Sequence, residues 1–405
     1  MAIPRIGDAL KKVGSSPILI FIVAMATRLS VLLHFVPLHP WADFYENNEP
    51  SRIAWALVSG FGYSSPWPHT PIAPTAQQPP VYPLLLAGIF KVAGAYSLAS
   101  LWIAIGLNGL FSALTAILIL RIGKRDFSDA VGILAAWFWA LWIYEAVVSI
   151  RLWESALTAL LLALTLLWLP RLAESGRGWY WVTFGLLAGM AVQTNTTMLA
   201  MVPCFYVWVW ARKAKEVSAK MLMVSFSAFL LALVPWTVRN YVVFDRLLPL
   251  RDNFGLELWV GNHEGVYESH RYPIDFPLLD PTEYNQLGEL RFMEATREAA
   301  FHFIRAHPGV FVLLCARRVV GFWINPKGSW WFAVSLLAWL GLGLALRKRA
   351  EVLTYLCVIV FFPLVYYITH TFPTYRHPIE PVVILLAAYA LWSGIEVTGR
   401  MIRNA

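Results

Sequence analysis

Three carboxylates stand close together after the first apolar run of the chain. Asp43, Glu46 and Glu49 fall within the ten residues from Trp41 to Pro50. On a helix Glu46 and Glu49 would share a face, and their repulsion with poor hydration near a membrane would raise the pKa of one of them. Such a carboxylate could take a proton from an acceptor hydroxyl. Any one of these acids taken alone is better explained as a solvated charge on a loop.

Cationic side chains near predicted helix ends could hold an anionic substrate. They are Arg151, Arg239, Arg376 and His377. Arginine suits phosphate because its planar guanidinium donates paired hydrogen bonds. For all but Arg151, an anchor at the membrane interface explains the residue equally well. Arg151 lies one turn before Glu154, so an ion pair between them is slightly favoured over acceptor binding by Glu154.

A polar cluster further along the chain is interleaved with aromatic residues. Its members are Asn253, Glu257, Asn262 and His263, with Trp259 among them. Aromatic faces beside amide and carboxylate groups suit a sugar ring, but they also suit a loop packed on a helix bundle. The acid that follows His263 does not complete an HExxH pattern, so no metal site is predicted here.

The composition indicates that membrane-spanning helices position these residues. Of 405 residues, 59% are hydrophobic and only 14% are charged, and the mean hydropathy is +0.59. A soluble domain carries about a quarter charged residues. The three cysteines form no CxxC pair, which argues against a zinc site or a disulfide scaffold. The net charge of +8 is explained by basic loops on the cytoplasmic side of a membrane, so no nucleic-acid partner is needed.

Ten apolar stretches predict an all-α polytopic protein. Most are long enough for a spanning helix of about 20 residues. Ten crossings that start inside leave every basic cluster and both termini in the cytoplasm. The stretches are 17–36, 97–120, 130–149, 153–170, 179–194, 196–211, 221–236, 329–346, 352–370 and 379–397.

Two large segments then lie on the outer face. The chain divides into an N-terminal transmembrane module (1–236), an extracytoplasmic segment (237–328) and C-terminal transmembrane helices (329–405). The first outer loop, 38–96, carries the acids and ends in a short apolar run, 81–96, expected to lie in the interface. The second outer segment contains a predicted amphipathic helix from Asn285 to Ala306. Residues 313–324 are ambiguous because two arginines stand in their middle.

Several phrases in order along the chain resemble bacterial glycosyltransferase family 39-like proteins. These are GT-C class enzymes, related to the protein O-mannosyltransferases and the lipid A aminoarabinose transferases. The phrases are IAWALVSGFGY (53–63), PTAQQPPVYPLLLAGIF (74–90), RLWE (151–154), PWTVRN (235–240), NFGLELWVGNHEG (253–265), LGELRF (287–292) and YRHPIEP (375–381). The resemblance implies a GT-C-like bundle and an enzyme that uses a polyprenyl-phosphate sugar.

The resemblance also assigns roles. A first-loop acid would be the base: Glu49 fits the spacing first, Glu46 second and Asp43 third. Gln78 stands where aminoarabinose transferases carry a phosphate-binding lysine, so other cations must hold the donor phosphate. The implied phosphate-binding residues are Arg239, Arg376, His377 and Arg151. The implied substrate-binding residues are Tyr82, Gln78, Glu154, Asn253, Glu257, Asn262 and His263.

The expected function is inverting transfer of a sugar from a polyprenyl-phosphate donor at the outer face of the inner membrane. The acceptor, whether protein, lipid or glycan, is open. No cofactor is required by the resemblance, and dependence on a metal stays open. The alternatives are a lipid or sugar transporter or flippase, and a non-catalytic binder of polyprenyl lipid. A transporter predicts ionisable residues deep within several spans, whereas here the acids gather in outer loops.

Overall fold

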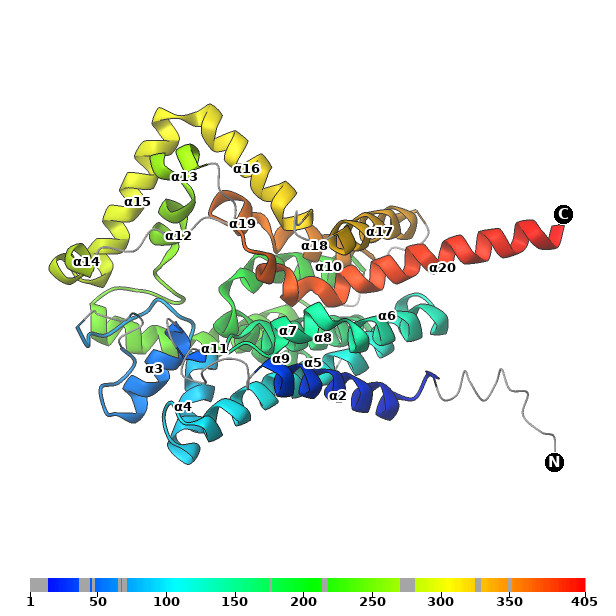
Figure 1. The fold of residues 1–405 in the computed structure, drawn as a ribbon, viewed down its shortest axis with the longest axis horizontal. Helices are drawn as coiled ribbons and strands as arrows, with labels where there is room; N and C mark the ends of the chain where they lie inside the picture. The colour runs from blue at the N-terminus through cyan, green and yellow to red at the C-terminus, as the bar shows by residue number, and fades with distance from the viewer. Residues whose placement is uncertain are drawn as a thin grey trace.

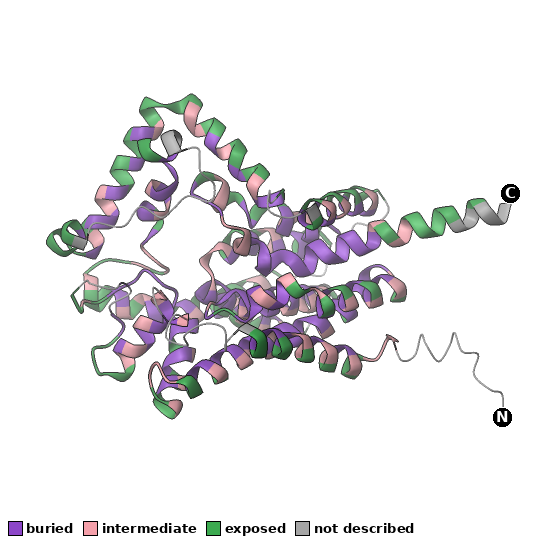
Figure 2. Ribbon diagram, in the orientation of Figure 1, coloured by how far each residue is buried: buried purple, intermediate pink, exposed green. Residues whose placement is uncertain are grey.

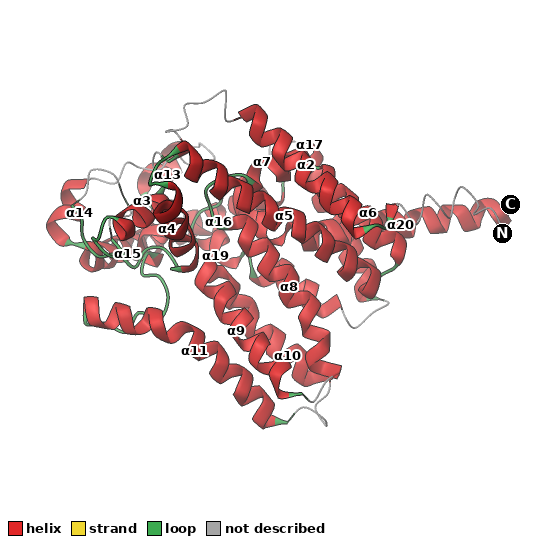
Figure 3. Ribbon diagram, turned by 90° about the horizontal axis from the view of Figure 1, so that it is seen from below, coloured by secondary structure: helices red, strands yellow, loops and turns green. Residues whose placement is uncertain are grey.

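The computed structural model describes residues 14–35, 44–45, 48–64, 67, 71–174, 177–212, 218–269, 281–324, 329–347 and 352–404. Over these residues the fold is helical, and its one β-bridge joins Ser64 to Pro74. Figure 3 shows the helices of the bundle packed side by side. The all-α architecture predicted from composition is confirmed.

Every predicted apolar stretch forms helix. The single helices long and apolar enough to cross a membrane are α2 (Pro17–Phe35), α5 (Leu98–Asp126), α8 (Ser155–Glu174), α11 (Ala219–Phe244) and α20 (Glu380–Asn404), which follows the 3₁₀ helix η5 (Pro373–Ile379). A bent pair, α6 (Asp129–Leu141) and α7 (Ile143–Ser149), meets at 63°. Shorter apolar elements complete the bundle: α9 (Gly178–Thr194), η3 (Thr196–Met201), α10 (Val202–Arg212), α17 (Ser329–Leu346), α18 (Leu353–Phe361) and α19 (Leu364–Ile368).

Small residues let neighbouring helices approach closely. A Cβ added to Gly185 of α9 would lie 2.1 Å from the carbonyl oxygen of Ser225 on α11. A Cβ on Gly341 of α17 would lie 2.0 Å from the carbonyl oxygen of Leu386 on α20. Lipid is as apolar as a leucine side chain, so close packing at small residues is a main source of helix association in a membrane.

The remaining helices gather at the end of the bundle opposite the two termini (Figure 1). From the first outer segment come α3 (Glu49–Val58) and α4 (Val81–Ala93). From the second come α12 (Phe254–Gly261), α13 (Glu264–Ser269), α14 (Pro281–Leu287), α15 (Glu289–Ala306) and α16 (Pro308–Trp323). Helices α15 and α16 meet at 107° and form an arch, exposed along its outer side in Figure 2.

One boundary prediction needs correction, and one ambiguous stretch is assigned to a helix. The amphipathic helix begins at Glu289 and not at Asn285, because Gly288 has a φ of +72° that ends α14 and separates it from α15. Residues 313–324 belong to α16, in which Arg318 is buried. Its guanidinium donates to the carbonyl oxygens of Tyr367 (3.3 Å) and Ile368 (3.0 Å), so the charge is solvated by protein rather than lipid.

Candidate active site

Glu49 opens α3 and faces two hydrogen-bond donors. Asn48 caps the helix by accepting from the Ser51 amide at 2.9 Å. The Glu49 carboxylate accepts from Trp67 Nε1 at 3.3 Å and, through its other oxygen, from the side-chain amide of Gln78. Gln78 therefore contacts the predicted base directly. The other two candidate bases, residues 43 and 46, lie outside the described residues.

Arg251 and Glu257 face the same region from the second outer segment. Arg251 donates to Glu257 Oε1 at 3.1 Å, and Asn253 donates to the same oxygen at 2.5 Å. His370 Nδ1 lies 3.5 Å from the other Glu257 oxygen, and its Nε2 lies 3.0 Å from Tyr375 Oη. The side chains of Arg251 and Glu257 are 24% and 29% exposed, so both reach solvent-accessible space.

Glu154 completes the group at the start of α8. Its side chain is 8% exposed and accepts a hydrogen bond from Asn195 Nδ2 at 3.3 Å. Arg251 acts electrostatically on both Glu154 and Glu49, which also repel each other. We call the group formed by Glu49, Glu154, Arg251, Glu257 and His370 the carboxylate site.

The carboxylate site can exchange protons near neutral pH. Burial raises the pKa of Glu49, while the hydrogen bond from Gln78 and the charge of Arg251 oppose that rise. Burial also raises the pKa of Glu154 to about 7. Burial lowers the pKa of His370, which favours its neutral form. A carboxylate with a raised pKa is a stronger base once it is deprotonated, which suits removal of a proton from a hydroxyl.

Arg239 fixes the first outer loop rather than an open pocket. Its guanidinium donates to the carbonyl oxygens of Thr75 (2.7 Å) and Tyr63 (2.6 Å). The same group lies 5.3 Å from the centre of the Tyr63 ring and 5.2 Å from that of Trp236. These contacts hold Tyr63 and Thr75 in place, and Tyr63 lies within the electrostatic reach of Glu49.

The YRHPIEP phrase lies inside the bundle. Arg376 is paired with Glu380, and His377 is paired with Glu145. Arg376 also donates to Ser335 at 2.6 Å and lies 3.7 Å from the centre of the Trp331 ring. No side chain of this buried quartet, Glu145, Arg376, His377 and Glu380, is more than 1% exposed. Arg151, by contrast, is exposed.

The other predicted substrate-binding residues mostly join helices to each other. Tyr82 is buried, and its hydroxyl accepts from Asn108 at 2.8 Å. Asn262 is also buried and donates to the carbonyl oxygens of Leu258 (2.7 Å) and Ile368 (2.9 Å). His263 is half-buried and stacks on Trp259, with ring centres 4.8 Å apart.

Sequence reasoning missed Arg251 and His370. Arg251 stands two residues before the NFGLELW phrase and carries no spacing signal of its own. His370 follows an apolar stretch, as an interfacial residue would. Only the fold places both against Glu257.

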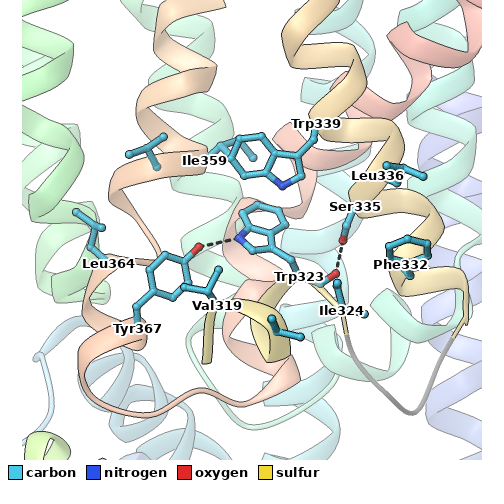
Figure 4. A pocket seen from close by; sticks show the side chains of 12 residues that line it. Val319, Trp323, Ile324, Phe332, Ser335, Leu336, Trp339, Ile359, Leu364 and Tyr367 are labelled. Carbon is cyan, nitrogen blue, oxygen red and sulfur yellow. Dashed lines mark hydrogen bonds between the residues drawn. The ribbon is translucent and has the colours of Figure 1, made fainter. Parts of the chain in front are cut away.

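An apolar groove opens among the helices near the second outer segment (Figure 4). It has a volume of about 480 Å³ and is lined by α16, α17, α18 and α19. In the groove Trp323 Nε1 donates to Tyr367 Oη at 2.7 Å. The Oη of Tyr366, the residue before Tyr367 on α19, instead lies 3.2 Å from Thr197 Oγ1. Tyr366 also interacts electrostatically with Glu154 and Arg251. Helix α19 therefore separates the groove from the site. The exposed groove residues are Val319, Val320, Ile324, Phe332, Leu336, Trp339, Val360 and Leu364.

A family model matches part of the chain. Residues 77–238 match the model of the family described as dolichyl-phosphate-mannose-protein mannosyltransferase. No curated protein sequence matches the chain.

Solved membrane enzymes share the fold. ArnT from Cupriavidus metallidurans bound to undecaprenyl phosphate aligns with a TM-score of 0.50 and 14% identity, over 94% of this chain and 62% of that one. The apo oligosaccharyltransferase of Archaeoglobus fulgidus aligns with a TM-score of 0.57 and 14% identity, over 96% and 52%. The same organism's AglB, in complex with an inhibitory peptide and a dolichol-phosphate, gives 0.55 and 13%, over 96% and 52%.

The chain spans between half and two thirds of the length of these proteins. The shared part therefore includes the helix bundle but not the whole of either relative. The chain is similar to the GT-C class of membrane glycosyltransferases, as its motifs predict. The similarity is in sequence over residues 77–238 and in fold over nearly the whole chain.

Proposed function

We propose that this protein is an inverting glycosyltransferase that moves a sugar from a polyprenyl-phosphate donor to an acceptor hydroxyl. The observation that carries the proposal is the carboxylate site, in which Glu49 has a raised pKa and lies within the electrostatic reach of Arg251. Both residues come from the two large segments at the end of the bundle opposite the termini (Figure 1). The family match at residues 77–238 supports the same chemistry.

In this proposal Glu49 removes the acceptor proton. The acceptor oxygen forms a bond to the sugar C1 as the bond from C1 to the phosphate oxygen breaks, which inverts the anomeric centre. The leaving group is a polyprenyl phosphate, so it needs a cation more than it needs a general acid. Arg251 is the cation best placed for this, because its side chain is partly exposed and its Nε has no hydrogen-bond partner among the described residues.

The donor phosphate must tolerate the nearby carboxylates. With a pKa of about 7, Glu154 is partly protonated at neutral pH. Together with the charge of Arg251, this limits the repulsion of an anionic donor.

The prenyl chain of the donor fits the apolar groove. In this proposal a chain in the groove lies across α19 from the carboxylate site, because Tyr367 lines the groove and the adjacent Tyr366 interacts with Glu154 and Arg251. The solved ArnT binds undecaprenyl phosphate and the solved AglB binds a dolichol-phosphate, which supports a ligand of this class for a chain with the same fold. Basic residues predicted on cytoplasmic loops support a site on the outer face of the membrane.

A transporter would use buried charges along a path through the bundle. The buried quartet does lie within the bundle, but its members pair with one another. Such fully buried pairs suit a structural role better than transient binding of a passing ion or sugar. The proposed transferase therefore accounts for more of the charged residues.

The test is a transfer assay with the purified protein in detergent or nanodiscs. The protein is incubated with a panel of polyprenyl-phosphate sugars and a mixture of membrane glycolipids and peptides, and mass spectrometry follows each donor. Consumption of one donor, with release of polyprenyl phosphate, is expected. If no donor is consumed while the same donors bind, the protein is a lipid binder and not a transferase.

A further inference from the structure

Trp67 and Gln78, the two hydrogen-bond donors of Glu49, belong to the first outer loop but are positioned by contacts with the second outer segment. The Trp67 ring packs against Tyr284, with centres 4.8 Å apart, and against Phe292, at 6.3 Å. Tyr284 belongs to α14 and Phe292 to α15. The orientation of the Trp67 indole N–H toward Glu49 therefore depends on the junction between these two helices.

Gln78 is held from the same junction. Glu289, the first residue of α15, accepts from the Ala76 amide at 2.6 Å and from Gln77 Nε2 at 3.4 Å. Tyr284 Oη donates to Glu289 at 3.1 Å. One carboxyl group thus connects α14 and α15 to the residues immediately before Gln78.

Asp252 forms the other half of this connection. Its backbone amide donates to the Ala76 carbonyl oxygen at 3.2 Å. Its carboxyl group faces that of Glu289. Both Asp252 carboxyl oxygens are buried, and neither has a donor from another residue within hydrogen-bond distance among the described residues. Two facing carboxyl groups repel when both are ionised, so this contact is favourable only when they share a proton.

The surrounding positive charges do not replace the shared proton, because neither arginine donates to the Asp252 carboxyl group. Arg239 of α11 and Arg251 act on Asp252 electrostatically, but Arg239 donates to backbone carbonyl oxygens and Arg251 to Glu257. The other titratable groups that face the pair are the hydroxyls of Tyr63 and Tyr284. Burial raises the pKa of Asp252 to about 6.

We propose that Asp252 and Glu289 share one proton and that this pair positions Gln78 and Trp67 against Glu49. Both acids are positioning residues that act through the first outer loop. Loss of the shared proton at alkaline pH makes the two carboxylates repel, which loosens residues 71–80. The assignment rests on the proposed role of Glu49, but the loosening of the loop does not depend on any donor.

Hydrogen exchange of the full-length protein in detergent tests the proposal. Protection of residues 71–80, corrected for intrinsic exchange, is measured from pH 6 to pH 9. We expect the wild-type protection to fall about tenfold, the change that one pKa unit of coupling produces. Glu289→Gln should keep the protection high and independent of pH, because the amide accepts from Ala76 and donates to Asp252 without titrating.

Two further variants make the result decisive. Asp252→Asn should also remove the pH dependence, since one member of the pair no longer ionises. Glu294→Gln, on the same helix but paired with Arg246 at the surface, should follow the wild type. A flat wild-type profile, or an equal fall in Glu289→Gln, would overturn the proposal. So would a flat Glu294→Gln profile.

The transfer assay separates this inference from the proposed function. If no donor is consumed but exchange behaves as expected, the shared proton stands and the transferase proposal fails. If a donor is consumed, the alkaline limb of the rate profile should be shallower in Glu289→Gln than in the wild type. Identical limbs in both proteins would show that the pair does not position the base.

Discussion

The carboxylate site and the buried quartet contain similar residue types but differ in how far their side chains are exposed. In the quartet each side chain contacts a partner of the quartet, and no side chain is more than 1% exposed. Each member also keeps one buried polar atom without a hydrogen-bond partner among the described residues. In the carboxylate site, three carboxylates surround one arginine, and the side chains of Arg251 and Glu257 are about a quarter exposed. An accessible set of charges can accept a substrate, whereas a fully buried set contributes to the specificity of the fold.

The largest effect that would test this comparison is loss of transfer in Glu49→Gln. The amide keeps the shape of the side chain but cannot accept a proton, so we expect a fall in kcat of about a thousandfold, within the range for removal of a general base. Donor consumption measured by mass spectrometry gives the rate, and thermal unfolding in detergent checks the fold. The matched control is Glu298→Gln, an exposed acid on α15. Turnover near the wild-type rate in Glu49→Gln would contradict the assignment.

For the quartet, the expected effect is on stability. Arg376→Gln leaves Glu380 buried without its ion pair, which costs about 3–5 kcal/mol when a buried pair is broken. Chemical denaturation in mixed micelles measures the change in the free energy of unfolding. The double variant Arg376→Gln/Glu380→Gln should recover part of the loss, because no unpaired charge remains. A stable single variant that loses donor binding would instead support the phosphate-binding role implied by the sequence.

Removal of Arg251 should reduce activity and leave stability nearly unchanged. Arg251→Gln is expected to unfold near the wild-type temperature but to lower kcat/KM about a hundredfold, comparable with loss of one electrostatic donor to a leaving group. The control is Arg246→Gln, which removes an arginine whose side chain is 52% exposed. If Arg251→Gln keeps full activity, the donor phosphate is held by another cation.

The fold could be predicted from sequence to a greater extent than the site. Apolar length and basic loops determine the helices, because each spanning helix satisfies its own backbone in lipid. Glu49 was predicted because the helix start and its motif are local features of the chain. Arg251 and His370 were missed because they meet Glu257 only through tertiary packing. Arg376 is the opposite case: the sequence suggests that it binds phosphate, but it does not show that Arg376 and its partner Glu380 are buried together.

A smaller effect is expected when the apolar groove is partly filled. Leu336→Trp adds bulk at a groove-lining position of α17, while Leu340→Trp adds it one turn away on the same helix, at a position that does not line the groove. Each displaced CH₂ of a prenyl chain loses about 0.8 kcal/mol of burial, so KM for a long-chain donor should rise several-fold. A donor with a single isoprene unit should show no change. Equal effects of the two variants would place the prenyl chain elsewhere.

The smallest expected effect is a shift in pH dependence. Glu49 acts as a base only when it is deprotonated, so kcat/KM should rise with pH through its raised pKa. Glu154 and Glu49 repel, so Glu154→Gln should lower the pKa of Glu49 and move this rise to lower pH by less than about one unit. Because Arg251 lowers the pKa of Glu49, the residual activity of Arg251→Gln should rise at higher pH. Shifts of opposite sign in these two variants would show that the charges act on one titrating base. If the rise of kcat/KM with pH shifts in the same direction in both variants, it reports the titration of a group other than Glu49.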